Sequence, residues 1–426
     1  MKAAREFPKF IISKKGVRWL EGGHPWAYAS DILQGPLSAD GSPLREDPGN
    51  GYLADVVSEN GKYLGTGFVS NESKIRVRIF SRNANDRFDE AFWSRRLSYA
   101  WDFRKTVMGG DVCCTRVIFG EADGFPGLTV DLFTDILVAQ TLSVGIERIK
   151  GMLFPRLVEM MEADGIRIRG LYERNDVAIR ELEGLPLYKG WFALPGRELP
   201  EETLTEICEN GIRYSVDVEN GQKTGFFLDQ KYNRLAVARL ARGKRVLDCF
   251  THTGAFALNA AMGGAEHVTA VDVSGTAIEM ARANAERNGL TERMDFLVAD
   301  VFDLLPTLKK EGSAFYGVND GKPYDFIILD PPAFTKSRRT ADNAEKGYKE
   351  INLAAMRLLP RGGYLATASC SHFMPCERFE AMLGEAAAEA GVELKCIEVR
   401  GAAPDHPVLW NVPETEYLKF YLFQLV

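Results

Sequence analysis

The sequence predicts an α/β protein with three parts: a β-rich N-terminal domain, a small central α/β domain and a larger C-terminal α/β domain. The first observation is that, from about residue 205 onward, short apolar segments alternate with helix-like segments. This alternation is typical of a parallel sheet with helices on both faces. The second is that the first 80 residues read as short strands separated by turns, as in a small barrel or compact sheet.

The N-terminal domain is predicted to span residues 1–80. Its clearest strand-like segments are 10–12, 51–57 and 75–80. Asn60-Gly61 is a hairpin signal, because both residues readily adopt the backbone conformation that tight two-residue turns need. In the last strand Arg76 and Arg78 alternate with apolar residues, so we expect one buried face and one basic face.

The central domain is predicted to span residues 81–200, linker included. We expect helices at 88–108 and 146–163, and strands at 127–133, 136–142 and 168–173. The segment from Leu185 to Pro200 is rich in Gly and Pro and is predicted to be the linker. In the C-terminal domain, 201–426, strands are expected at 245–249, 267–271, 295–298, 325–329 and 363–368.

Composition is that of an ordinary globular protein, with 46% hydrophobic and 26% charged residues. No run approaches the roughly 20 apolar residues of a membrane-spanning helix, and the N-terminus has no apolar core of a secretory signal. Seven cysteines, an odd number, indicate reduced thiols and a cytoplasmic location. Without a Cys-x-x-Cys pair we expect no structural metal.

The net charge of −7 works against non-specific adhesion to nucleic acid. Any such binding must therefore use local basic patches. The first 20 residues form one such patch, which includes Lys14 and Lys15.

Four aspartates follow apolar strands of the C-terminal domain: Asp248, Asp272, Asp300 and Asp330. Their spacings of 24, 28 and 30 residues each match one strand and one helix, and such sheets bind ligands at the carboxyl ends of their strands. A lone aspartate there is more often a helix cap than a ligand, but the regular spacing favours a site. We expect Asp272 to take both ribose hydroxyls of a nucleoside and Asp300 to meet an adenine amino group.

The loop after the first of these strands has one glycine, Gly254, between Asp248 and Phe256. Gly254 permits a tight turn and opens a helix whose N-terminus faces the ligand. A dinucleotide-binding dehydrogenase would have G-x-G-x-x-G here. The absence of those glycines favours a cofactor without a diphosphate, such as S-adenosylmethionine.

Cys370 follows the apolar strand 363–368 and is therefore expected at the same edge of the sheet. A thiolate that adds to carbon 6 of a pyrimidine makes carbon 5 nucleophilic enough to accept a methyl group. The start of the next helix, near Pro375, would help to stabilise the thiolate. A buried cysteine that acts as a small hydrophobe is the alternative interpretation. Two histidines are assigned no role: His372, two residues after Cys370, and His406 in Asp405-His406-Pro407.

Asp330 opens Asp330-Pro331-Pro332-Ala333-Phe334, in which the paired prolines fix the backbone after a strand. Asp330 can reach a base amino group or ring nitrogen. Phe334 either stacks on a base taken out of its helix or belongs to the core. The basic loop that follows, with Lys336, Arg338 and Arg339, suits phosphate contacts.

Several motifs in order resemble one family. They are Lys14-Lys15-Gly16 with His24-Pro25-Trp26, the segment 221–230 (GQKTGFFLDQ), Asp330-Pro331-Pro332, Gly347-Tyr348-Lys349, Ser369-Cys370-Ser371 and Asp405-His406-Pro407. The chain resembles the bacterial ribosomal RNA large-subunit 5-methylcytosine methyltransferases over nearly its whole length. It differs from their pattern at His372 and Ala333. The resemblance implies a PUA-like domain, a central α/β domain and a Rossmann-like class I methyltransferase domain.

The resemblance also implies roles for individual residues. Cys370 would be the nucleophile and Asp330 the acid that contacts the base. The residues expected to bind S-adenosylmethionine are Lys223, Phe226, Asp248, Phe250, Thr253, Gly254, Asp272, Val273, Asp300, Val301 and Asp330. Those expected to bind RNA are Lys14, Lys15, Arg76, Arg78, Phe334, Lys336, Arg338 and Arg339.

Three functions remain open at this point. The first is an S-adenosylmethionine-dependent RNA methyltransferase that forms 5-methylcytosine in 23S ribosomal RNA. The second is an amino-group methyltransferase acting on guanine or adenine, which needs no cysteine but typically has its aromatic residue directly after Pro-Pro, where this chain has Ala333. The third is a catalytically silent RNA-binding assembly factor. The expected partner is ribosomal RNA, not a membrane, and the oligomeric state stays open, with a homodimer among the options.

Overall fold

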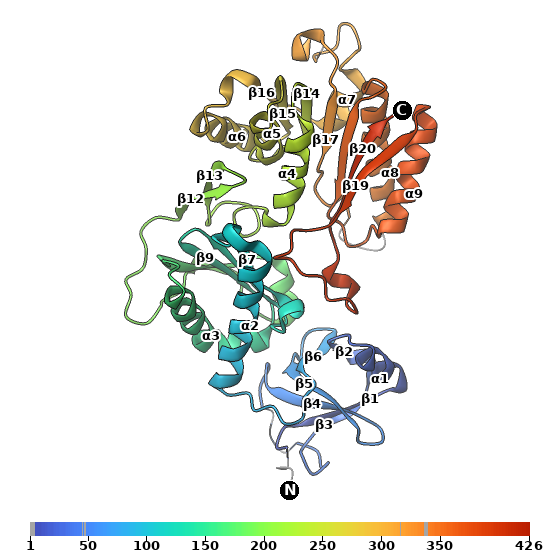
Figure 1. Ribbon diagram of the computed structural model, residues 1–426. Coiled ribbons are helices and arrows are strands. Elements are labelled where there is room, and N and C mark those ends of the chain that lie inside the picture. The colour runs from blue at the N-terminus through green and yellow to red at the C-terminus, as the bar shows by residue number, and fades with distance from the viewer. Residues whose placement is uncertain (1–4, 45, 47, 316, 336–339) are drawn as a thin grey trace. The chain divides into compact units, whose positions relative to one another are not determined.

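The computed structural model describes residues 5–44, 46, 48–315, 317–335 and 340–426. The chain divides into two compact units (Figure 1). The first comprises residues 1–207, 216–228 and 404–415, and the second comprises residues 208–215, 229–403 and 416–426. No helix in the described part of the chain is both long and apolar enough to cross a membrane.

The first unit begins with a six-stranded sheet in the order β2-β6-β5-β4-β1-β3. Its elements are β1 (Lys9–Ile12), α1 (Lys14–Glu21), β2 (Trp26–Tyr28), β3 (Ile32–Leu37), β4 (Leu53–Ser58), β5 (Tyr63–Val69) and β6 (Ile75–Ser81). The Asn60-Gly61 turn joins the antiparallel strands β4 and β5, which confirms the hairpin predicted there. Helix α1 was not predicted; it begins where the Ser13 side chain accepts a hydrogen bond from the Gly16 backbone.

A second sheet of the same unit has the order β11-β10-β9-β8-β7. Its elements are α2 (Glu90–Met108), β7 (Cys114–Phe119), β8 (Leu128–Phe133), β9 (Ile136–Thr141), α3 (Val144–Ala163), β10 (Gly170–Asn175) and β11 (Tyr188–Trp191). The prediction that 185–200 is only a linker is wrong, because β11 pairs with β10 and Trp191 packs edge-on against Tyr172 at 5.0 Å. Phe68 and Phe80 from the first sheet belong to the same core cluster as Trp93 of α2.

A two-stranded sheet, β12 (Leu204–Glu209) with β13 (Ile212–Asp217), follows. Short 3-10 helices occur at Ala29–Asp31, Gly109–Asp111, Gly120–Asp123, Ala178–Glu183, Leu228–Gln230, Thr291–Arg293, Val318–Gly321 and Pro413–Thr415.

The second unit contains a seven-stranded sheet in the order β16-β15-β14-β17-β18-β20-β19. Its strands are β14 (Arg245–Cys249), β15 (His267–Asp272), β16 (Met294–Val298), β17 (Phe326–Leu329), β18 (Tyr364–Ser369), β19 (Leu394–Arg400) and β20 (Lys419–Leu425). The first five run parallel, as predicted. The sheet as a whole is mixed, because β20 pairs antiparallel with both β18 and β19.

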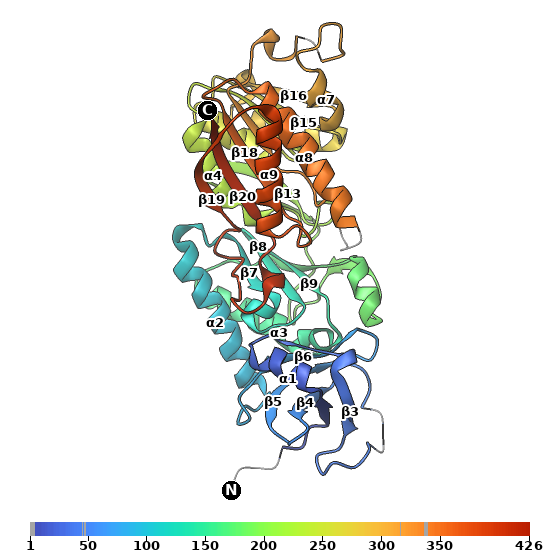
Figure 2. The ribbon, with the colours of Figure 1, turned by 90° about the vertical axis from the view of Figure 1, so that its right-hand side faces the viewer.

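Helices cover this sheet: α4 (Lys231–Leu240), α5 (Ala255–Met262), α6 (Gly275–Arg287), α7 (Val301–Thr307), α8 (Ala341–Leu358) and α9 (Cys376–Ala390). Helices α7, α8 and α9 share a core with the Leu247 and Cys249 side chains of β14, and α8 and α9 lie side by side (Figure 2). The intervening Asp248 faces α5 instead, since strand side chains alternate between faces. The carboxyl ends of the five parallel strands thus lie along one edge, which positions the candidate site.

Candidate active site

Asp248 ends up fully buried near the carboxyl end of β14. Its Oδ2 accepts hydrogen bonds from Thr251 Oγ1 at 2.6 Å and from the Ala257 amide at 2.9 Å. Within the described residues its Oδ1 has no hydrogen-bond partner. Burial raises the pKa of Asp248 to about 7; the nearby Asp330 and Asp272 act in the same direction, and the two hydrogen bonds oppose it. A buried carboxyl group with hydrogen-bond partners on only one of its two oxygens, at this edge of the sheet, indicates a binding site for a polar ligand.

The loop after β14 is held in an unusual backbone conformation. Phe250, His252 and Gly254 have φ of 64°, 51° and 83°, the left-handed region that only glycine adopts without strain. A Cβ at Gly254 would also lie 3.0 Å from the Cβ of Ala281 on α6. Thr253 is buried, and its Oγ1 has no hydrogen-bond partner among the described residues. The loop therefore offers a second polar atom in need of a partner.

Asp272 ends β15 with its carboxylate fixed by two backbone amides. The His252 amide donates to Oδ2 and the Ser274 amide to Oδ1, each at 2.9 Å. Each oxygen keeps further lone-pair capacity for a hydroxyl group. The arrangement suits two neighbouring hydroxyls, such as those of a ribose.

Around the carboxyl end of β16 some of the predicted site residues are exposed and one is buried. Asp300 is exposed and caps α7, because its Oδ1 accepts from the Phe302 amide at 2.9 Å. Val301 is 2% exposed and its side chain packs in the core, which favours its backbone as the ligand contact. Val273 and Val298 are 71% and 54% exposed. These two apolar side chains follow or end neighbouring strands and offer a surface for a flat ring; the role of Val298 was not predicted.

Asp330 follows β17 and is oriented by a side chain that sequence reasoning missed. Gln230, buried, donates from Nε2 to Asp330 Oδ1 at 2.9 Å. Its own Oε1 accepts from Asn233 Nδ2 at 2.6 Å, which fixes the orientation of the amide. Gln230 is the last residue of the segment 221–230, so that motif was the signal available in the sequence.

Cys370 follows β18, the parallel neighbour of β17, and is partly buried. Leu329 and Thr367 are register partners, so Asp330 and Cys370 emerge at neighbouring strand ends. The buried Tyr348 of α8 lies close to both: burial raises its pKa to about 12, and Cys370 and Asp330 act in the same direction. By contrast, Cys249 is fully buried, and burial raises the pKa of its thiol well above the usual value.

Phe334 lies in an aromatic cluster. Its ring centroid is 4.6 Å from that of Tyr348, 5.7 Å from Phe302 and 6.4 Å from Phe250. These contacts favour the core interpretation of Phe334 over a base-stacking role. The basic residues predicted to follow it, Lys336, Arg338 and Arg339, lie outside the described residues.

Other predicted site residues belong to the first unit. Lys223 is exposed, with φ of 52° and its Nζ 4.6 Å from the Phe227 ring centroid, whereas Phe226 is buried. Asp405 is buried and accepts hydrogen bonds from Thr115 Oγ1 and the Arg116 amide, which is a structural role.

The predicted RNA contacts on the first sheet also differ from one another. Lys14 and Lys15 are exposed on α1, and Arg76 is partly exposed. The expectation that Arg78 lies on an open basic face is wrong. Its side chain pairs with Glu183 at 2.8 Å and with Glu121 at 3.5 Å, so its charge is compensated inside the unit.

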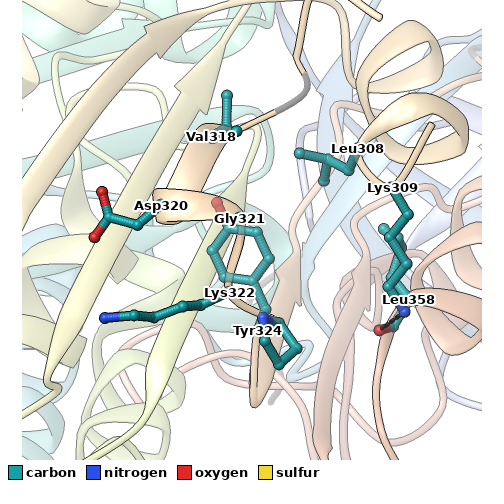
Figure 3. A pocket seen from close by; sticks show the side chains of 10 residues that line it. Leu308, Lys309, Val318, Asp320, Gly321, Lys322, Tyr324 and Leu358 are labelled. Carbon is teal, nitrogen blue, oxygen red and sulfur yellow. Dashed lines mark hydrogen bonds between the residues drawn. The ribbon is translucent and has the colours of Figure 1, made fainter. Parts of the chain in front are cut away.

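A pocket of about 510 Å³ in the second unit is lined by Leu308, Lys309, Leu358 and residues 317, 318 and 320–324 (Figure 3). The segment 317–324 leads into β17, and Leu358 ends α8 ahead of β18. The pocket therefore lies at the amino-terminal ends of these strands, the edge opposite Asp330 and Cys370, and is no part of the site described above.

Comparisons with known proteins bear on both units. Residues 193–424 match the family model described as S-adenosylmethionine-dependent methyltransferase, and residues 10–82 match that of the PUA-like domain. The chain is 40% identical over 402 residues to Ribosomal RNA large subunit methyltransferase I of Shewanella amazonensis, covering 94% of this chain and 95% of that protein. It is 37% identical over 415 residues to the protein of that name from Klebsiella pneumoniae strain 342, covering 97% of each.

Among solved structures, the fold is similar to that of a protein crystallised in complex with SAH. The TM-score is 0.78 at 22% identity, covering 98% of this chain and 100% of the other. Together, the mixed α/β fold, the loop at Asp248 and the family match define an S-adenosylmethionine-dependent methyltransferase with an N-terminal PUA-like domain. The chain belongs to the Ribosomal RNA large subunit methyltransferase I family, which confirms the resemblance noted from its motifs.

The residues present fit this cofactor. Asp248 Oδ1 and Thr253 Oγ1 are buried polar atoms without a partner in the described residues, and a nucleoside with a charged amino-acid tail offers donors and acceptors. Asp272 presents a carboxylate suited to ribose hydroxyls. The site thus supplies both polar partners and an exposed apolar surface at Val273 and Val298.

Proposed function

We propose that this enzyme methylates carbon 5 of a cytosine in 23S ribosomal RNA, with Cys370 as the nucleophile. The observation that carries the proposal is that Cys370 and Asp330 follow the carboxyl ends of two neighbouring parallel strands of the methyltransferase domain. The names of its relatives, which describe large-subunit ribosomal RNA methyltransferases, support the substrate class.

Cys370 and Asp330 have different tasks in this proposal. The sulfur of Cys370 forms a bond to carbon 6, which moves a ring electron pair toward carbon 5. Bound S-adenosylmethionine supplies the methyl group. The proton on carbon 5 then leaves to a base, the bond between sulfur and carbon 6 breaks, and its electron pair returns to sulfur. Asp330, oriented by Gln230, contacts the ring nitrogen or exocyclic amine and stabilises the activated ring.

The remaining residues are proposed to bind cofactor. Asp272 takes the ribose hydroxyls and Asp300 the adenine amino group. The other proposed contacts are Lys223, Phe226, Asp248, Phe250, Thr253, Gly254, Val273, Asp330 and the backbone of Val301.

The RNA is proposed to lie against the N-terminal domain, residues 1–80, through Lys14, Lys15 and Arg76. The exposure of the two lysines on α1 supports their role. Lys336, Arg338 and Arg339, outside the described residues, are further proposed phosphate contacts. Arg78 is left out, since its charge is already paired.

The test compares two cysteine variants. Cys370→Ala and Cys376→Ala are each incubated with labelled S-adenosylmethionine and ribosomal RNA from cells that lack the enzyme, and the modified base is mapped. Both cysteines are partly buried, so the two substitutions are matched. We expect no methylation by Cys370→Ala and normal methylation of a cytosine by Cys376→Ala. Near-normal methylation by Cys370→Ala would rule out the carbon-5 mechanism and favour an amino-group target.

A further inference from the structure

Strand β20 brings a buried lysine to the segment that contains Cys370. Lys419 is the first residue of β20 and the register partner of Ser369, the residue directly before Cys370. Lys419 is only 4% exposed, although lysine is almost never so deeply buried without a specific partner. The register of β18 and β20 thus fixes a cation next to the candidate nucleophile.

The amino group of Lys419 is directed at the backbone after Cys370. Its Nζ donates to the Ser371 carbonyl oxygen at 2.6 Å and to the Tyr417 carbonyl oxygen at 2.8 Å. Ser371 is itself buried, and its hydroxyl donates to the Thr335 carbonyl oxygen at 3.3 Å. Bonds to two different parts of the unit therefore hold this short segment in place.

Three titratable groups face Lys419: Cys370 after β18, Cys376 at the start of α9, and Glu416 just before β20. Burial lowers the pKa of Lys419 to about 8, and the three facing groups oppose that change. A neutral amide could satisfy two carbonyl oxygens without the desolvation cost of an ammonium group. The positive charge is supported by the facing groups Cys376, Cys370 and Glu416. Of these, Cys370 is the candidate nucleophile, and a nearby cation favours its thiolate.

We propose that Lys419 is a positioning residue for Cys370: its ammonium group fixes the segment that carries the cysteine, and its charge favours the thiolate over the thiol. The inference rests on the proposed role of Cys370 as nucleophile. The thiol proton leaves to solvent, sulfur keeps the electron pair that bonds to carbon 6, and Lys419 keeps its own three protons. Lys419 contacts neither the base nor the cofactor in this proposal.

The test measures alkylation of Cys370 by iodoacetamide as a function of pH, with mass spectrometry of the peptide that contains it. Lys419→Gln keeps a hydrogen-bond donor and removes the charge, whereas Lys419→Arg keeps the charge. We expect Lys419→Gln to move the pH midpoint up by about one unit, which is about tenfold slower alkylation at pH 7. Lys419→Arg should stay near the wild type. Alkylation of the exposed Cys396 is the internal control and should not change.

Binding of S-adenosylhomocysteine checks that each lysine variant is folded. An unchanged Cys370 midpoint in a folded Lys419→Gln protein would overturn the inference.

A reciprocal measurement needs no lysine variant, because coupling between two sites acts equally on both. In Cys370→Ala, NMR titration of 15N-lysine-labelled protein should show Lys419 losing its proton at lower pH than in the wild type. An identical titration in the two proteins would also overturn the inference.

These results separate the inference from the proposed function. Alkylation and lysine titration need no RNA, whereas methylation by Cys370→Ala tests the nucleophile itself. If Cys370→Ala is inactive and Lys419→Gln alkylates normally, the nucleophile stands and the role of Lys419 is wrong.

Discussion

Two fully buried aspartates, one in each unit, differ in how many hydrogen bonds the protein donates to their carboxylate oxygens. In the first unit, both carboxylate oxygens of Asp131 accept hydrogen bonds from the Arg116 guanidinium, at 2.7 and 2.8 Å. Oδ2 also accepts a hydrogen bond from the Thr224 hydroxyl at 2.6 Å. In the second unit, Asp248 has partners on Oδ2 only, and burial raises its pKa to about 7. A buried carboxylate that the protein satisfies completely is structural. One left half-satisfied at the carboxyl end of a parallel strand indicates a ligand site.

The largest effect is expected from Asp131→Ala. The substitution leaves the guanidinium of Arg116, which is 13% exposed, without its carboxylate. Removing one partner of a buried pair should lower the free energy of unfolding by about 3–5 kcal/mol. Urea denaturation followed by tryptophan fluorescence measures it. A loss below about 1 kcal/mol would mean that this pair is not the structural element described here.

Asp272→Ala should weaken binding of the cofactor. Loss of the carboxylate leaves the ribose hydroxyls without partners, so the affinity for S-adenosylhomocysteine should fall by about 1–3 kcal/mol. Calorimetry measures it, with Asp295→Ala as control, since Asp295 is an exposed acid near the amino-terminal end of β16, the neighbour of β15. Equal affinities of Asp272→Ala and wild type would remove Asp272 from the site.

Asp248→Asn should change the pH dependence of stability. The pKa of Asp248 in the folded protein, about 7, lies above its ordinary value of 3.8. Between these two pH values the folded protein therefore binds more protons at this carboxyl group than the unfolded protein does. The wild type therefore loses stability from this group as pH rises from about 4 to 7, and the neutral amide does not. Relative to wild type, Asp248→Asn should gain about 2–3 kcal/mol from pH 5 to pH 8 without ligand. Denaturation at both pH values measures it, and a constant difference would contradict the assigned pKa.

The smallest effect is expected from Lys14→Glu with Lys15→Glu. Both side chains are exposed, so stability should not change. RNA affinity should fall about equally for different sequences, and the salt dependence of binding should weaken by a slope of roughly 2. Filter binding across salt concentrations measures this. Deleting residues 1–80 would be a poorer test, because Phe68 and Phe80 belong to the core that surrounds Trp93. An unchanged salt slope would exclude α1 from the RNA contact.

Most of the parallel strands could be predicted because they are short, buried apolar runs with an aspartate or Ser-Cys-Ser at their carboxyl ends. Strand β16 is less buried, since Asp295 and Val298 are exposed. The strands β19 and β20 were not predicted. In β19 most side chains are exposed, and its sequence, LKCIEVR, includes three charged residues. Its place in the sheet depends on pairing with β20, a contact that local sequence does not encode.

The site was predictable where residues lie at strand ends and not where burial depends on tertiary packing. Asp248, Asp272, Asp330 and Cys370 lie at the expected edge. Lys419 was missed because a lysine that begins a strand is normally solvated, and only the β18–β20 register buries it. Conversely, Arg78 was expected to be open, but Glu183, distant in sequence, pairs with it.

The most direct test of the central proposal is covalent trapping with RNA that carries 5-fluorocytosine at the mapped target. Fluorine at carbon 5 cannot leave as the proton does, so the bond between Cys370 and carbon 6 cannot break after methyl transfer. We expect a complex of protein and RNA that survives denaturing electrophoresis, requires S-adenosylmethionine, forms with Cys376→Ala and is absent with Cys370→Ala. If wild-type enzyme methylates the normal RNA but forms no such complex, or if Cys370→Ala forms it equally well, Cys370 is not the nucleophile.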